Sequence, residues 1–111
     1  MLEYLFGSQI LEKILFFLLK NERCYASQLK TVFDQPLFSF QRALARLEKG
    51  GVLISKREGK NLIYEINPRY PFLEELVNLL KKGYDFLPQV IKEKYYEPLI
   101  RKRPRRSGKP L

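Results

Sequence analysis

The chain has 111 residues, with 21 basic and 12 acidic side chains, a net charge of +9 and no histidine. Its length suits a single domain, and its 45% of hydrophobic residues can supply one core. With Cys24 as the single cysteine, the composition excludes an intrachain disulfide, a histidine-assisted nucleophile and a Cys/His metal cluster. No nucleotide-binding glycine pattern is present either, so we expect no enzymatic activity, no catalytic residue and no cofactor.

The N-terminal part predicts a helix over residues 8–20. Ser8 suits the N-cap position, and apolar residues follow it at helical spacing. The Gly-Ser pair before this helix also occurs in nucleotidyltransferases, but the paired acids that those enzymes need do not follow it here. The apolar run at 14–19 is shorter than the roughly 20 residues that span a bilayer, and no signal-cleavage site follows. We therefore expect a cytoplasmic protein with no membrane partner.

Cys24 lies in a short piece, residues 23–25, that is predicted to be extended. A lone cysteine can sense oxidants, which requires a lowered thiol pKa, and only Arg23 lies nearby to lower it. A packed, inert thiol is therefore the favoured interpretation.

Two helices separated by a turn are predicted next. Ser27 is the expected N-cap of a short helix over 27–33, and Asp34-Gln35-Pro36 is typical of a turn. The second helix is predicted over Leu37–Lys49, because Gly50-Gly51 suits a helix end.

The two faces of this second helix differ. Phe40, Leu44 and Leu47 recur on one face, which we expect in the core. Phe38 lies on the other face and could complete the core, contact a thymine methyl group or bury in a partner, and local packing is preferred. The residues on or beside the face predicted to be exposed are Phe38, Ser39, Gln41, Arg42, Ala45, Arg46 and Lys49.

A β-hairpin is predicted directly after this helix. Its strands are expected at 52–56 and 61–66, with a basic tip at 57–60 and an end at Asn67-Pro68. The side chains that it could offer to a polyanion are Lys56, Arg57, Lys60 and Asn61.

The C-terminal part predicts two more helices. The first starts near Pro71 and carries a wide apolar stripe over Phe72–Leu80, which predicts contact with a second copy of the chain. A break is expected near Gly83, and a last helix is predicted over 88–97, with its inward side chains being Val90, Ile91 and Tyr95.

Residues 101–111 hold six of the basic side chains and no acid. They are too poor in apolar residues to bury a core, so they predict a flexible basic tail. The tail could contact DNA or only keep the protein dissolved, and its predicted contact residues are Arg101, Lys102, Arg103, Arg105 and Arg106.

The stretch YASQLKTVFDQPLFSFQRALARLEKGGVLISKREGKNLIYEINP, Tyr25–Pro68, joins the two helices, the turn and the hairpin. It resembles the winged helix-turn-helix of bacterial and archaeal ArsR/MarR-type transcriptional regulators, and the resemblance covers about residues 5–80. The chain lacks the thiolate or histidine sets of the metal sensors in this class, so metal sensing is not carried over. The positions that match the family pattern approximately are Arg42, Leu44, Leu47, Glu48, Gly51, Val52, Leu53, Gly59 and Tyr64.

The resemblance implies a mostly α, α+β winged helix-turn-helix with additional C-terminal helices. Residues 1–80 would be the DNA-binding domain, and 81–100 a helical segment that could dimerise. The second helix would enter the major groove, and the hairpin would meet phosphates or the neighbouring minor groove. Ser27 would meet a phosphate at the helix start. We expect sequence-specific binding of double-stranded DNA by a homodimer, with half-sites about one DNA turn apart.

Two other functions stay open at this point. A winged helix can serve as a protein-interaction module, and positive charge alone can bind DNA or RNA without reading sequence. The sequence does not identify a small-molecule effector.

Overall fold

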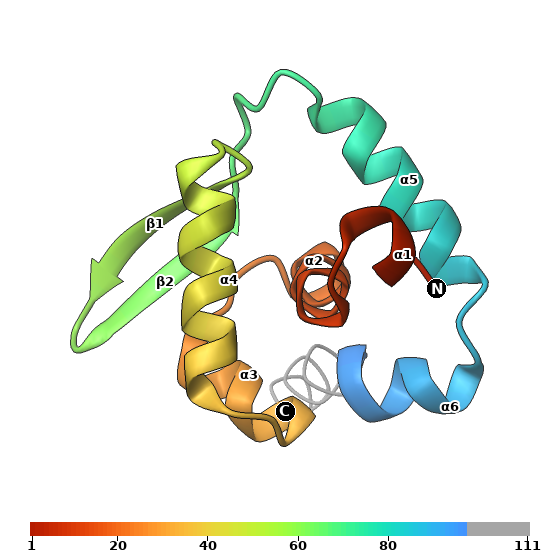
Figure 1. The fold of residues 1–111 in the computed structure, drawn as a ribbon, viewed down its shortest axis with the longest axis horizontal. Coiled ribbons are helices and arrows are strands. Elements are labelled where there is room, and N and C mark those ends of the chain that lie inside the picture. Colours follow the sequence, from red (N-terminus) through yellow and green to blue (C-terminus); the bar gives the residue numbers. More distant parts are fainter. Residues whose placement is uncertain (98–111) are drawn as a thin grey trace, which may run out of the picture.

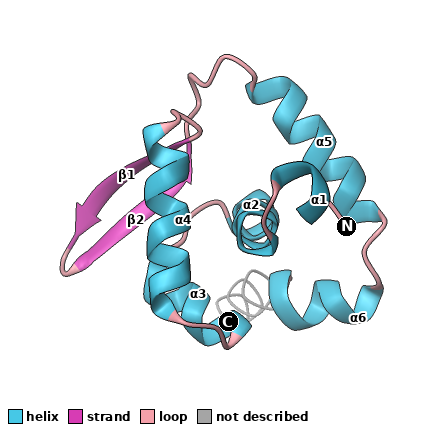
Figure 2. Ribbon diagram, viewed as in Figure 1, coloured by secondary structure: helices cyan, strands magenta, loops and turns pink. Residues whose placement is uncertain are grey.

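The computed structural model describes residues 1–97; residues 98–111, with the predicted basic tail and its five contact residues, lie outside the described part. The described part is mostly helical with one antiparallel hairpin, which confirms the α+β composition (Figure 2). None of its helices is long and apolar enough to cross a membrane. In chain order the elements are α1 (Glu3–Phe6), α2 (Gln9–Asn21), α3 (Ala26–Phe33), α4 (Leu37–Lys49), β1 (Leu53–Glu58), β2 (Asn61–Ile66), α5 (Leu73–Asp85), α6 (Gln89–Ile91) and a π-helical turn, η1 (Lys92–Tyr96).

Helix α2 lies at the centre of the molecule, with α4 and the hairpin to one side and α5 to the other (Figure 1). Ser8 caps it as predicted, because its hydroxyl accepts the backbone N–H groups of Ile10 and Leu11 at 3.1 and 3.2 Å. Ile14, Phe16 and Phe17 are completely buried. The apolar run that is too short for a membrane is therefore the axis of the core.

The N-cap of helix α3 is Tyr25, two residues before Ser27, so the assignment of Ser27 as the N-cap is wrong. Cys24 and Tyr64 exchange two backbone hydrogen bonds of 3.0 and 2.8 Å, which hold the preceding chain beside the hairpin. The chain turns into the helix immediately afterwards, with extended Tyr25 at the N-cap and its N–H donated to Gln28 Oε1. Ser27 therefore lies in the first turn and is exposed.

Helix α4 has the bounds that were predicted, and the hairpin follows it. The first strand runs to Glu58, so the predicted strand end and four-residue tip are wrong. Glu58 pairs with Asn61, and the chain reverses through Gly59, whose φ of +62° favours glycine, and Lys60. The two-residue turn places Arg57 within the strand.

The break predicted near Gly83 comes only after Asp85, since α5 continues through the glycine. Gly83 is buried, and a Cβ atom there would lie 3.1 Å from Leu2 Cδ1 and 3.3 Å from Phe16 Cζ. The glycine therefore serves close packing and does not end the helix.

The segment after α5 turns back against α2 (Figure 1). The rings of Tyr84 and Tyr96 lie 6.0 and 5.9 Å from the ring of Phe16, so residues on both sides of position 80 share one core. Ile91 and Tyr95 pack against the core as predicted, but Val90 is 70% exposed, so its predicted inward position is wrong. The proposed division at residue 80 stays a prediction.

Candidate nucleic-acid interface

The exposed side of α4 carries most of the residues selected from the sequence. Phe40 and Leu44 fill the core, and this fixes the opposite side of the helix toward solvent. The one acid of the helix, Glu48, accepts a hydrogen bond from Ser55 Oγ at 2.6 Å beside the hairpin. The predicted side chains that α4 exposes are Phe38, Gln41, Arg42, Ala45, Arg46 and Lys49, with Ser39 half-buried beside them.

Phe38 does not complete the core. It is 63% exposed, and the guanidinium of Arg42, one turn along, lies 5.4 Å from the centre of its ring. The core position near this end of α4 is filled by Phe40, stacked on Phe33 at 5.9 Å between ring centres. Phe38 is therefore a platform that restricts the orientation of Arg42, since cations are attracted to aromatic faces.

A first hollow, here called the hairpin groove, lies between the start of α3, the side of α4 and the hairpin. Its volume is about 280 Å³. Among the described residues that line it none is acidic, and two are cations. The predicted residues that it brings together are Ser27, Gln41, Arg57, Lys60 and Asn61.

The first turn of α3 faces this same groove through Tyr25, Ala26 and Ser27. The first backbone N–H groups of a helix lack intrahelical acceptors, and the helix dipole makes that end partly positive. Together with Arg57 and Lys60, this turn makes the groove favourable for a phosphate group. Ser27 thus lines the hairpin groove beside the other predicted residues, although it is not the cap.

A second hollow, here called the α2 groove, lies on the other side of α4, against the start of α2. Its volume is about 420 Å³, and the described residues that line it are again free of acids. Ser8, Ile10 and Leu11 form its α2 side, and the sequence did not single these three out as site residues. The α4 side consists of Phe38, Ser39, Arg42, Ala43 and Arg46.

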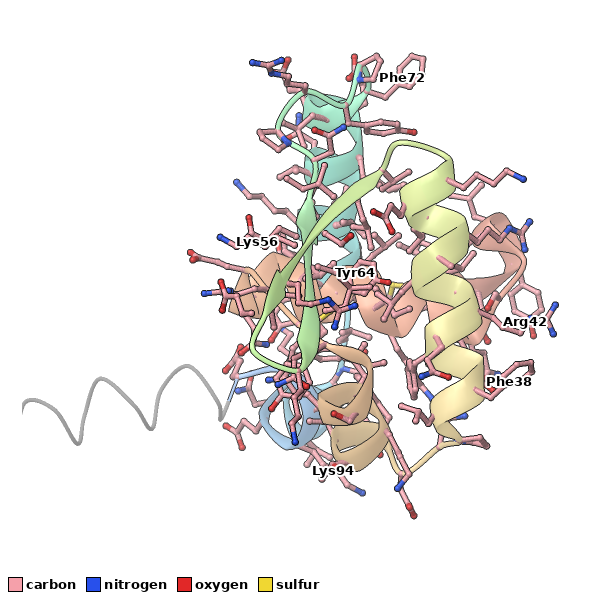
Figure 3. The ribbon with its side chains drawn as sticks, turned by 90° about the vertical axis from the view of Figure 1, so that its left-hand side faces the viewer. Phe38, Arg42, Lys56, Tyr64, Phe72 and Lys94 are labelled. Atoms are coloured by element: carbon pink, nitrogen blue, oxygen red, sulfur yellow. The ribbon has the colours of Figure 1, made fainter. Side chains whose placement is uncertain are left out.

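The hairpin divides its predicted cations between two faces. Arg57 points into the hairpin groove, and because side chains alternate along a strand, Lys56 lies on the opposite face. Figure 3 shows Lys56 and Arg42 on opposite sides of the molecule. Lys56 therefore does not join the surface that the other predicted residues form.

Lys56 also forms an ion pair within the chain. Its Nζ lies 3.6 Å from Glu58 Oε2, which also accepts a hydrogen bond from Arg23 Nη2 at 2.5 Å. The Arg23 guanidinium holds the pKa of the Glu58 carboxyl below its usual value. The free cations of the hairpin are those that face α4.

Cys24 is packed, as the sequence favoured. It is 1% exposed, and burial raises the pKa of its thiol to about 12. Such a thiol is not ionised near neutral pH. Within residues 1–97 no three His, Cys, Asp or Glu side chains gather as metal ligands would.

No protein-family model matches this chain, and no curated protein is significantly similar to it.

Proposed function

We propose that this protein is a winged helix-turn-helix protein that binds double-stranded DNA in a sequence-specific manner and regulates transcription as a homodimer. The observation that carries the proposal is the pair of grooves beside α4, whose described lining residues include no acid, together with the arginines that α4 exposes. DNA carries a dense row of phosphates, so a protein that approaches its bases needs such a surface.

The element order supports this function. Helix α3, a short turn, helix α4 and the hairpin follow one another as the helices and the wing do in a winged helix-turn-helix. An α-helix is about 10–12 Å across with its side chains, and the major groove is about 12 Å wide. In this arrangement α4 enters the groove and the hairpin lies over the adjacent backbone.

The side chains on α4 suit base recognition. Arg42 and Arg46 can each donate two hydrogen bonds to a guanine edge, and Gln41 can pair with adenine. Phe38 holds the Arg42 guanidinium in place, which lowers the entropy lost when it binds a base. Arg57, Lys60 and the first turn of α3 would contact phosphates and set the register of α4.

A protein-interaction module is the second candidate, and the exposed aromatic residues favour it. Phe38 is 63% exposed and Phe72 is 61% exposed. Exposed aromatic side chains at a surface often mark protein contacts. Phe38 distinguishes the two functions, because it lies under Arg42 in the first and would insert into a partner in the second.

The test is selection from a pool of random duplexes, with affinity followed across salt concentrations. Recovery of a recurring palindrome, bound with a steep salt dependence, is the expected result. Steep salt dependence without an enriched sequence would replace the proposal by non-specific nucleic-acid binding. A lack of binding at low salt would replace it by the interaction module.

A matched pair of variants separates these functions further. Arg42→Ala should abolish the sequence enrichment, whereas Phe38→Leu, which keeps an apolar side chain, should weaken it only in part. If both variants select the same palindrome as the wild type, α4 is not the recognition helix.

A further inference from the structure

Helix α5 has two apolar faces, and only one of them lies in the core. Leu76, Leu80 and Tyr84 pack inward. The residues that recur along the second face at spacings of three and four, from the N-cap Phe72 to the C-cap Phe86, are all exposed: Phe72, Glu75, Leu79, Lys82 and Phe86. Phe72, Leu79 and Phe86 are 61%, 36% and 71% exposed. We name this second face the α5 seam.

The seam adjoins the core face, and this explains the width of the apolar stripe in the sequence. With about 100° between successive residues of a helix, the seam and the core face together cover roughly half of the circumference. The polar side consists of Glu74, Asn78, Lys81 and Asp85, all exposed. A spacing of three and four is the pattern by which helices pair side by side.

The order of residues along the seam is nearly the same in both directions. Reading from Phe72 to Phe86, an aromatic ring stands at each end and Leu79 at the middle. Only Glu75 and Lys82 differ on reversal, and they carry opposite charges. An antiparallel second copy centred on Leu79 would therefore place each ring level with a ring, and each acid beside a base.

We infer that the α5 seam is the surface through which two copies of this chain associate, with their α5 helices antiparallel. Phe72 then packs on Phe86 of the partner subunit, Leu79 on its own counterpart, and Glu75 pairs with Lys82 of the partner subunit. The inference rests on the homodimer in the proposed function and names its surface.

Charge selects the antiparallel direction. A parallel pair would place each Glu75 beside its counterpart and each Lys82 beside its counterpart, and like charges in contact are destabilising. The antiparallel pair forms two symmetric opposite-charge contacts, within about one residue rise of level. Within residues 1–97 neither Glu75 nor Lys82 forms an ion pair, so both charges are available.

The end of the seam is held at the surface. The ring of Phe72 makes an edge contact with Tyr70, with ring centres 5.7 Å apart, yet stays mostly exposed. Figure 3 shows it projecting from the end of the molecule. No residue of α4 or the hairpin belongs to the seam, so self-association and DNA contact can be separated by mutation.

The test is sedimentation equilibrium of the full chain over a range of concentrations. Glu75→Lys and Lys82→Glu should each weaken the dimer about tenfold or more, because each replaces two opposite-charge contacts by two like-charge contacts. The chain with both substitutions should dimerise like the wild type. An equimolar mixture of the two single variants should form a heterodimer.

The matched control is Glu74→Lys, the same charge change on the same helix, about 140° around it from Leu79. It should leave the dimer unchanged, whereas Leu79→Lys should abolish it. Unfolding curves on each variant separate loss of association from loss of the fold.

Several outcomes would overturn the inference. The wild type must not stay monomeric, and each single variant must dimerise more weakly than the wild type. The inference also fails if the double variant does not recover the wild-type dimer affinity. Binding to a selected half-site is measured on the same samples. A monomer that binds the half-site refutes dimerisation through the α5 seam and leaves DNA recognition intact. A dimer that is sensitive to these charge changes but binds no DNA supports the seam and refutes DNA recognition.

Discussion

Helices α4 and α5 are the same length and use their buried faces alike, but their exposed faces differ. Each has 13 residues, one completely buried leucine in the core and an exposed phenylalanine near its start. Helix α4 carries three basic side chains and one acid, which is bonded to Ser55. Helix α5 carries acids in its first turn and lysines near its end.

The difference shows how similar amphipathic helices can serve different partners. Hydrophobic burial is non-directional, so it places both helices on the core without defining what their outer faces bind. The arrangement of charge does define it. A face with one sign of charge suits a polyanion, and a face with acids at one end and bases at the other suits a reversed copy of itself.

The largest expected effect tests the buried faces, which are alike in α4 and α5. Leu44→Ala in α4 and Leu80→Ala in α5 each remove a completely buried side chain. Each should lower the free energy of unfolding by about 2–5 kcal/mol, measured by urea denaturation. Asn78→Ala, on the polar side of α5, should change it by less than about 0.5 kcal/mol. A large loss for only one leucine would show that the inner faces are not equivalent.

The next effect tests the outer face of α4. Arg42→Ala should lower the affinity for the selected duplex by about 1–3 kcal/mol and relax the preference at one base pair, measured by fluorescence anisotropy. Lys81→Ala removes the same charge from the polar side of α5 and should change DNA affinity little. Equal losses for Arg42→Ala on selected and random duplexes would refute a base-reading role.

The elements that depend on local sequence were predictable. Helix α4 begins and ends where Pro36 and Gly50-Gly51 indicate, and Ser8 caps α2 as its position suggests. The helix break expected near Gly83 comes only after Asp85, because a glycine also permits close packing, and only the approach of Leu2 and Phe16 shows that Gly83 has this role. Periodicity likewise missed the π-helical turn that ends at Tyr96, a residue of the core.

The candidate site was predictable helix by helix, but its assembly was not. The exposed face of α4 follows from a 3.6-residue period. The length of β1 depends on a two-residue turn, and this turn decides that Arg57 and Lys56 face opposite ways. The contribution of Ser8 and Leu11 to the α2 groove is a tertiary feature that no local pattern carries.

A smaller effect compares Lys60, a hairpin lysine without an ion pair among the described residues, with one that is paired, Lys56. Lys60→Ala should weaken binding to selected and random duplexes alike and lower the slope of log affinity against log salt by about 1. Lys56→Ala is the matched control on the same hairpin, and it should lower the slope less, because Lys56 faces away and is paired with Glu58. An equal change in both slopes would show that DNA contacts both faces of the hairpin.

The smallest effect concerns Glu58, the acid that forms ion pairs with Arg23 and Lys56. The hydrogen bond from Arg23 lowers the pKa of Glu58 from its ordinary value of 4.5. A carboxyl with a lowered folded-state pKa stabilises the fold fully above its unfolded pKa, and this contribution disappears as the pH falls through the folded value. Arg23→Ala should therefore lower the unfolding midpoint slightly at pH 7, and the difference from the wild type should shrink below pH 4.5.

Glu58→Gln provides the control, since it removes the carboxyl that accepts the hydrogen bond from Arg23 and should reduce the pH dependence of the effect of Arg23→Ala. A difference that persists at low pH in the wild-type background would assign the effect to packing of the Arg23 side chain. In that case Lys56 and Arg23 would be as available to a polyanion as Lys60 is. The two faces of the hairpin would then differ only in the direction in which their side chains point. The same rule applies to α4 and α5. A cation there contributes to binding a partner only to the extent that it is not already paired with an acid of its own chain.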